Sequence, residues 1–351
     1  MFGNASKGTG KMVTIRQIAK CAGVSTATVS NVIHGKVNKV SPGTIARIQR
    51  LIDEMGYVRE QGQTVSRSRS SRMVAVIIHF HRSFEDTALS DPFYGVITGS
   101  IEEELRQRRC VMMLYTSQDV EDIIQMLAVW DVDGVIAISF SNADCKKIYN
   151  MFQKPMITID AYGEDDEVSS IPNIALDDEQ GGYLMARHLV ELGYENILMG
   201  GVDDYGIDRC RWHGMQRACA DTLFLKEKKK LNYIRLGDTL EARKSRYQEI
   251  AKQVPFKRKT AIFFSSDSLA MEAICFWTEQ GIRIPRDFGV AGFDNSANAV
   301  HFSIPRLTTI HQDVRQKGVI AVEELVTALR DPEYKPNSHR LPVCLVSRQS
   351  V

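Results

Sequence analysis

The chain has 351 residues, of which 44% are hydrophobic and 25% charged, a composition typical of a globular protein with two or three domains. No run of about 18 apolar residues indicates a transmembrane helix, and the N-terminus lacks the apolar segment of a secretory signal. The seven cysteines form no C-x-x-C pair, so we expect reduced thiols in the cytoplasm rather than a disulfide framework or a cysteine zinc site.

Charge is distributed unevenly along the chain. Residues 1–72 hold twelve Lys or Arg and three Asp or Glu, a balance of +9, whereas the remainder has a balance of −8. A basic head on an acidic body favours a polyanionic partner for the head, and the alternative is a solvated basic tail. Within this region, residues 1–12 are expected to form a flexible extension.

Residues 13–58 predict three short helices, because apolar side chains recur there at helical spacing. Thr14 is a candidate N-cap of the first helix, and Gly23 ends it. Ser25 is placed to cap the second helix, and Pro42 stands at the first position of the third. Two short helices joined by a tight glycine turn and braced by a third form a helix-turn-helix. The inward-facing side chains are expected to be Ile15, Ile18, Ala19, Ala22, Val29, Val32, Ile33, Ile45, Ile48, Ile52 and Met55.

The second predicted helix has an unusually slim outer face. It carries only small or polar side chains, namely Thr26, Ala27, Thr28, Ser30 and Asn31. Such a face suits the major groove, where Ala27 can contact a thymine methyl group and Asn31 can pair with adenine. Helical periodicity alone leaves open a small bundle that contacts another protein.

Residues 59–72, "REQGQTVSRSRSSR", are polar, rich in Ser and Arg, and without apolar periodicity. They indicate a hinge linker between domains. Arginines 67, 69 and 72 could contact phosphates, and the alternative is a plain linker.

From Met73 the pattern changes to alternating strands and helices. Apolar runs such as "MVAVIIHF", "GVIAIS" and "PMITID" alternate with helical stretches, and the rhythm resumes with "ENILMGG", "TAIFFSSD" and "FGVAGFD". This alternation predicts an α/β fold with two doubly wound parallel-sheet lobes. We expect residues 73–172 and 304–334 in lobe 1, and 173–303 and 335–351 in lobe 2. Ligands of such sheets bind at the carboxyl ends of strands, here in the cleft between the lobes.

The ordered stretch "TIRQIAKCAGVSTATVSNVIHG", with "VSPGTIARIQRLIDEMGY", resembles the DNA-binding head of the lactose/galactose-repressor (LacI/GalR) family. Body stretches such as "GIRIPRDFGVAGFDN" and "PRLTTIHQD" extend the resemblance over residues 13–351. It implies a body similar to periplasmic binding proteins, which binds an effector and forms homodimers on palindromic operators. The implied effector is a sugar, a sugar phosphate, or a nucleoside or purine.

The resemblance also implies roles for residues of the head and hinge. Base-reading positions of the family fall on Thr26, Ala27 and Asn31, and phosphate-contact positions fall around Thr14, Ser25, Thr28 and Ser30. Relatives usually wedge a leucine into the minor groove from the hinge, and Ser66 stands at that position, with Val65 beside it. Gly62 disfavours a hinge helix by roughly 1 kcal/mol relative to Ala.

In the body, the implied ligand positions are Asp160, Asp294 and Arg211. For these three residues, the alternative is a structural ion pair. Phe93 and Tyr94 could stack on a sugar ring or belong to the core.

The next candidates in the body follow the strand "TAIFF". Ser266 stands where many relatives have Asn, and the adjacent Asp267 is expected to cap the following helix. Trp212 is expected to serve packing.

The sequence therefore predicts a DNA-binding transcriptional regulator of the repressor type, controlled by a small-molecule effector. The alternative is a binding protein or a nucleoside-processing enzyme with an incidental basic head. No G-x-S-x-G, P-loop or H-E-x-x-H motif occurs, and the eight histidines show no metal-ligand spacing. We accordingly expect no enzymatic activity, no cofactor, no metal and no membrane partner.

Overall fold

The computed structural model describes residues 14–33, 40–55, 72–80, 88–163, 171–203, 206–222, 230–253 and 259–351. The chain divides into two compact units, Met1–Ser70 and Ser71–Val351. The predicted extension, residues 1–12, and nearly all of the predicted hinge, including Val65 and Ser66, lie outside the described residues. No described helix is long and apolar enough to cross a membrane.

The first unit contains the three predicted helices, α1 (Ile15–Ala22), α2 (Thr26–Ile33) and α3 (Pro42–Met55). Thr14 and Gln17 form a capping box at the start of α1, and Gly23 ends that helix with a φ of 63°. The Ser25 hydroxyl accepts a hydrogen bond from the amide of Thr28, as predicted for a cap of α2. The buried apolar residues that hold the helices together are Ile18, Ala19, Ala22, Val29, Val32 and Ile48.

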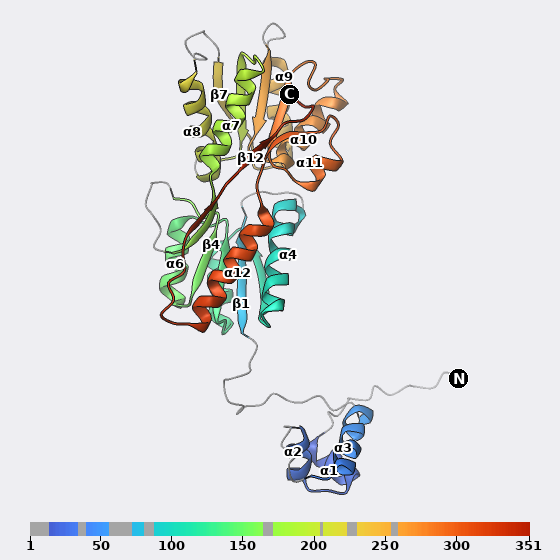
Figure 1. The fold of residues 1–351 in the computed structure, drawn as a ribbon. Helices are drawn as coiled ribbons and strands as arrows, with labels where there is room; N and C mark the ends of the chain where they lie inside the picture. The colour runs from blue at the N-terminus through green and yellow to red at the C-terminus, as the bar shows by residue number, and fades with distance from the viewer. Residues whose placement is uncertain are drawn as a thin grey trace, which may run out of the picture. The chain divides into compact units, whose positions relative to one another are not determined.

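In the second unit, a first parallel sheet has the strand order β11-β5-β4-β3-β1-β2. Its strands are β1 (Met73–His79), β2 (Val111–Ser117), β3 (Gly134–Ile138), β4 (Met156–Ile159), β5 (Asn173–Leu176) and β11 (His339–Leu341). The short helix η1 (Ala88–Ser90) precedes the helices that cover this sheet, which are α4 (Pro92–Gln107), α5 (Val120–Val129), α6 (Asn142–Phe152) and α12 (Val314–Arg330) (Figure 1).

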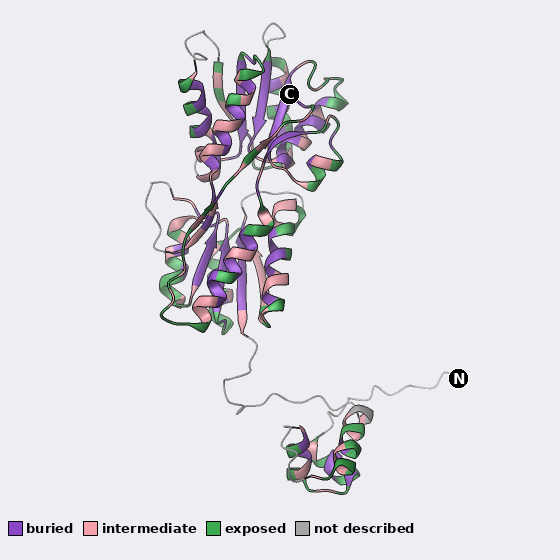
Figure 2. Ribbon diagram, viewed as in Figure 1, coloured by how far each residue is buried: buried purple, intermediate pink, exposed green. Residues whose placement is uncertain are grey.

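Both faces of this first sheet are buried, which explains the continuous apolar run of β1. Val74 and Val76 belong to the core cluster that contains residues of α4 and α12. Ala75 and Ile77 belong to a different cluster, with residues of α5 and α6. In Figure 2 the central strands β1, β3 and β4 are largely buried, whereas the covering helices also carry exposed residues. A strand covered on both faces needs apolar side chains at every position rather than at alternate ones.

The second sheet has the order β12-β10-β9-β8-β6-β7, in which β10 and β12 pair antiparallel. Its strands are β6 (Asn196–Gly201), β7 (Lys230–Arg235), β8 (Thr260–Phe264), β9 (Gly289–Asp294), β10 (Thr308–His311) and β12 (Cys344–Val346). The accompanying helices are α7 (Asp178–Glu191), α8 (Gly206–Asp221), α9 (Leu240–Gln253), α10 (Asp267–Glu279) and α11 (Ala297–His301).

Two glycines allow α7 and α8 to approach closely. A Cβ atom on Gly182 would lie 1.9 Å from the carbonyl oxygen of Arg211, and one on Gly214 would lie 1.8 Å from that of Glu179. Any larger residue would push the helices apart, so these glycines fix the position of Arg211 relative to α7.

The expected lobe boundaries were wrong at three short strands. Residues 173–176 form β5 of the first sheet, not of the second, and residues 308–311 form β10 of the second sheet, not of the first. Residues 339–341 form β11 of the first sheet as well. These strands have three or four residues each, and both sheets offer a buried apolar environment, so their composition does not specify a sheet. We use lobe 1 for the first sheet with its helices and lobe 2 for the second.

Candidate functional site

A cavity of about 490 Å³ lies between the carboxyl ends of the strands of the two lobes. This volume falls within the roughly 300–1,000 Å³ usual for small-molecule sites. The predicted effector residues all line it: Phe93, Tyr94, Asp160, Arg211, Ser266 and Asp294. Among the residues that line the cavity but were missed from the sequence are Asp91, Ser139, Tyr162, Ser265 and Gln312.

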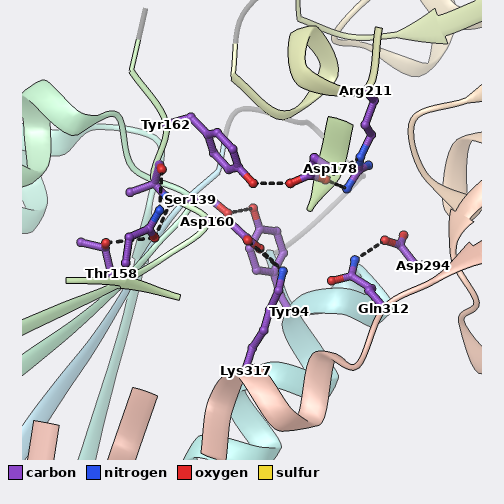
Figure 3. Close-up of polar contacts among 12 residues, drawn as sticks. Tyr94, Ser139, Thr158, Asp160, Tyr162, Asp178, Arg211, Asp294, Gln312 and Lys317 are labelled. Atoms are coloured by element: carbon purple, nitrogen blue, oxygen red, sulfur yellow. Dashed lines mark hydrogen bonds and ion pairs between the residues drawn. The ribbon is translucent and has the colours of Figure 1, made fainter. Parts of the chain in front are cut away.

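Asp160 follows β4 and is buried against a cation from the same lobe. Its two carboxylate oxygens lie 2.8 and 2.6 Å from Nζ of Lys317, a fully buried lysine on α12 (Figure 3). Burial raises the pKa of Asp160, and the positive charge of Lys317 opposes that rise. The structural ion pair that the sequence left open is therefore present, in a wall of the cavity. The position of Lys317 one and two helical turns before Ala321 and Leu325 was the signal that could have identified it.

Arg211 on α8 is held on three sides. Its Nε and Nη2 lie 2.9 and 2.8 Å from Oδ1 of Asp178, and its Nη1 donates to the carbonyl oxygen of Ser265. The guanidinium carbon lies 3.4 Å from the ring centroid of Phe293. Burial lowers the pKa of Arg211, but nearby carboxylates, above all Asp178, raise it by more. The pKa therefore lies above its ordinary value, and the guanidinium stays charged.

A hydrogen bond joins the two lobes beside this ion pair. Tyr162, which follows β4 in lobe 1, donates its hydroxyl proton to Oδ2 of Asp178 at the start of α7 in lobe 2 (Figure 3). Burial raises the pKa of Tyr162 well above its ordinary value, and the charge of Asp178 adds to the effect. Tyr162, Asp178 and Arg211 thus form a continuous polar chain from one lobe to the other.

Asp294 ends β9 and faces Gln312, which follows β10. The side-chain nitrogen of Gln312 donates to Oδ1 of Asp294. Burial raises the pKa of Asp294 to about 6, although the charge of Arg211 opposes that rise. Both side chains come from the carboxyl ends of adjacent strands, as the sheet order requires.

Phe93 and Tyr94 begin α4, where Asp91 caps the helix by accepting a hydrogen bond from the amide of Phe93. Their rings stand edge to face with centroids 5.3 Å apart, and the Tyr94 hydroxyl lies 3.2 Å from that of Ser139. Both rings line the cavity and also pack against the core, so the two interpretations of these aromatics coexist.

The expected cap of α10 was wrong by one residue. Ser266 is the N-cap and accepts from the amide of Leu269, whereas Asp267 is buried inside the first turn. There Asp267 accepts from the amide of Ser296 and the hydroxyl of Thr309, 2.7 and 2.6 Å away. Two donors from other segments hold the carboxylate, which local sequence cannot show. Trp212 packs edge to face against Tyr233, in agreement with its expected packing role.

In the head, the outward face of α2 is as slim as predicted. Thr26, Ala27 and Asn31 are exposed, and Val29 and Val32 are buried on the opposite face. Thr14 and Ser25 are exposed as well. They precede the N-termini of α1 and α2, where backbone amides and hydroxyl groups can bind phosphates. Thr28 and Ser30 are half-buried.

The raised pKa of Asp294 predicts a pH-dependent stability. Because the folded pKa of about 6 exceeds the ordinary 3.8, the folded state binds the proton more tightly, and stability falls as pH rises between these values. The free energy of unfolding of Asp294→Asn should therefore exceed that of the wild type above pH 6 by on the order of 3 kcal/mol, and this advantage should vanish near pH 4. Thermal unfolding at both pH values tests this. Asp131→Asn, at an exposed site, is the control, and an equal pH dependence of the wild type and Asp294→Asn would contradict the assignment.

Comparison with known proteins gives matches to both units. Residues 14–60 match the bacterial regulatory proteins of the lacI family, and residues 186–351 match the periplasmic binding protein-like domain. The chain is 30% identical over 350 residues to the HTH-type transcriptional repressor PurR of Aliivibrio fischeri, covering 97% of this chain and 98% of the relative. PurR of Photobacterium profundum is 29% identical, with 97% and 99% covered.

Solved structures share the fold. The lac repressor dimer bound to operator and the anti-inducer ONPF superposes with a TM-score of 0.75 at 23% identity, covering 97% of this chain and 99% of that one. The complex of the transcriptional regulator CelR with cellobiose gives a TM-score of 0.66 at 24% identity, covering 97% and 100%.

Proposed function

Because this chain belongs to the lacI family of bacterial regulatory proteins, we infer that it is a DNA-binding transcriptional repressor whose operator affinity depends on a small molecule. The observation that carries this function is the combination, in one chain, of two features. These are a three-helix head with a slim, exposed α2 and a cavity lined by polar side chains at facing strand ends. The first feature suits the major groove, and the second suits a small polar effector.

The proposed assignments of residues follow the positions that the family resemblance implies, and the exposure of Thr14, Ser25, Thr26, Ala27 and Asn31 supports them. Thr26, Ala27 and Asn31 read base edges, while the positions that contact phosphates are Thr14, Ser25, Thr28 and Ser30. The effector is bound from lobe 1 by Phe93, Tyr94 and Asp160, and from lobe 2 by Arg211, Ser266 and Asp294. The chain acts as a homodimer on a palindromic operator in the cytoplasm, as two identical heads require two half-sites. The cleft binds its ligand without catalysing a reaction.

A gel-shift experiment tests this function. DNA from around the gene of this protein should be retarded by the full chain, and the affinity should change when sugars or nucleosides are added. Failure to retard any such fragment, with a folded protein in hand, would rule the function out.

Asn31 is expected to carry sequence specificity. Its amide offers one donor and one acceptor, which match N7 and N6 of adenine and discriminate by roughly 1–3 kcal/mol. Asn31→Arg should shift the preference toward guanine at one symmetric position of each half-site, because a guanidinium fits O6 and N7 of guanine. Selection of binding sites from random DNA checks this, and the same consensus for both proteins would refute it.

A further inference from the structure

The wall of the cavity is rich in carboxylates. Of the described residues that line it, six are aspartates and one is an arginine: Asp91, Asp144, Asp160, Asp203, Asp208, Asp294 and Arg211. A phosphate or carboxylate on a ligand would meet this surplus of negative charge at close range, in a site of low dielectric where charges interact strongly.

Among the described residues, two cations beside the cavity are already paired with carboxylates. Each terminal nitrogen and Nε of Arg211 donates within the protein, to Asp178 or to the carbonyl oxygen of Ser265. The ammonium of Lys317 is fully buried between the carboxylate oxygens of Asp160 and the face of Phe93, whose ring centroid is 5.3 Å away. An anionic ligand would therefore meet two cations whose charges are already balanced by buried carboxylates, Arg211 by Asp178 and Lys317 by Asp160.

The cavity also requires hydrogen-bond donors from its ligand. Gln312 is only 4% exposed, and its side-chain oxygen has no hydrogen-bond partner among the described residues. The orientation of this amide is fixed because Asp294 can only accept, so the nitrogen must face Asp294 and the oxygen is turned away from it (Figure 3). The hydroxyl oxygen of Ser265, 1% exposed, likewise lacks a partner within the described part of the chain. A buried acceptor without a donor is costly, so the ligand supplies a donor to the oxygen of Gln312, and the hydroxyl of Ser265 can accept from the ligand or donate to it.

Two of the carboxylates belong to opposite lobes. Asp91 precedes α4 in lobe 1, and Asp294 ends β9 in lobe 2. Both carboxylates line the same cavity, so their like charges disfavour each other. Burial is the main cause of the raised pKa of Asp294, the charge of Arg211 opposes that rise, and the charge of Asp91 adds to it. A positive charge between them would convert that repulsion into attraction toward both lobes.

Aromatic rings stand next to this position. Phe93 and Tyr94 line the cavity directly after Asp91, at the start of α4. A ring face attracts a cation and also stacks on the apolar face of a sugar ring. The cavity therefore combines carboxylates, unpaired acceptors and aromatic rings in a volume of about 490 Å³.

We propose that the effector of this cleft is an amino sugar, whose ammonium group is held by Asp91 from lobe 1 and by Asp294 from lobe 2. The proposal rests on the function inferred above, since it concerns the ligand of the same cleft. It excludes effectors that carry a phosphate or carboxylate group. One hydroxyl group of the sugar donates to Gln312, and another pairs with the hydroxyl of Ser265.

Isothermal titration calorimetry with matched sets of sugars tests the proposal. Each set contains the neutral hexose, its 2-amino derivative and its 6-phosphate, for glucose, galactose and mannose. In at least one set, the amino sugar should bind the full-length protein about tenfold or more tightly than the neutral hexose, because its hydrogen bonds are charge-assisted. The phosphate should bind least.

Two variants separate a specific contact from a general effect of charge. Asp91→Asn keeps a side chain that caps α4 equally well, and it should abolish the advantage of the amino sugar over the neutral hexose. Asp131→Asn removes the same charge from an exposed site on lobe 1 and should preserve that advantage. Asp91→Glu keeps a carboxylate at this position. If this variant binds the amino sugar more tightly than the neutral hexose while Asp91→Asn does not, the carboxylate itself is needed.

The proposal fails if a 6-phosphate binds as tightly as the amino sugar, if the neutral hexose does so, or if no amino sugar binds. Each of these results leaves the inferred function standing when the same preparation retards operator DNA. Loss of operator binding by the wild-type protein would instead refute the function itself.

Discussion

Arg211→Ala is expected to destabilise the body by about 3–5 kcal/mol, the usual cost of removing one partner of a buried ion pair. The variant leaves Asp178 almost fully buried, with Tyr162 as its remaining hydrogen-bond donor among the described side chains. Replacing both Arg211 by Met and Asp178 by Asn should recover most of this loss, because no charge then stays uncompensated. Urea unfolding of the three proteins measures these differences.

Arg217 offers a matched control on the same helix. It pairs with Glu179 from α7, as Arg211 pairs with Asp178, but its side chain is 47% exposed. Arg217→Ala should cost less than about 1 kcal/mol, since solvent screens an exposed pair. If Arg211→Ala costs no more than Arg217→Ala, the buried pair does not stabilise the cleft as the structure implies.

Removal of the head should abolish operator binding. A fragment of residues 72–351 retains both sheets and their cores, but it lacks α2 and most of the +9 charge of residues 1–72. The full chain should bind with an affinity that falls steeply with salt, by a log–log slope of about −0.9 for each phosphate contacted. Fluorescence anisotropy of a labelled operator between low and moderate salt measures both effects. Circular dichroism of the fragment confirms that it is folded, and a folded fragment that still bound the operator would contradict this assignment of DNA binding.

Much of the fold could be predicted because its signals are local. The run of β1 is apolar at every position, and helical spacing with caps at Thr14 and Gly23 marks the head. The ends of β4 and β9 also pointed to Asp160 and Asp294, because parallel sheets bind ligands at their carboxyl edges. For each of these features, a short stretch of residues contains the whole signal.

The remaining features depend on partners distant in sequence. Asp160 and Lys317 are 157 residues apart, and Arg211 and Asp178 are 33 apart, so neither ion pair shows in a local pattern. Tyr162 joins Asp178 only because the chain crosses between the lobes after β5. The same crossings explain the wrong boundaries at β5, β10 and β11, since a strand of only three or four residues carries too little sequence to specify its sheet.

The most direct test of the account is the operator affinity of the full chain with and without the sugar that binds most tightly in calorimetry. A ligand in the cleft that controls the head should change the operator affinity of the wild type by about 5- to 150-fold, the usual range of coupling between sites. Asp294→Asn should lose most of this change at the same sugar concentration, because a charge that holds the ligand is gone. An operator affinity that does not respond in the wild type, or that responds equally in Asp294→Asn, would contradict control of DNA binding from this cleft.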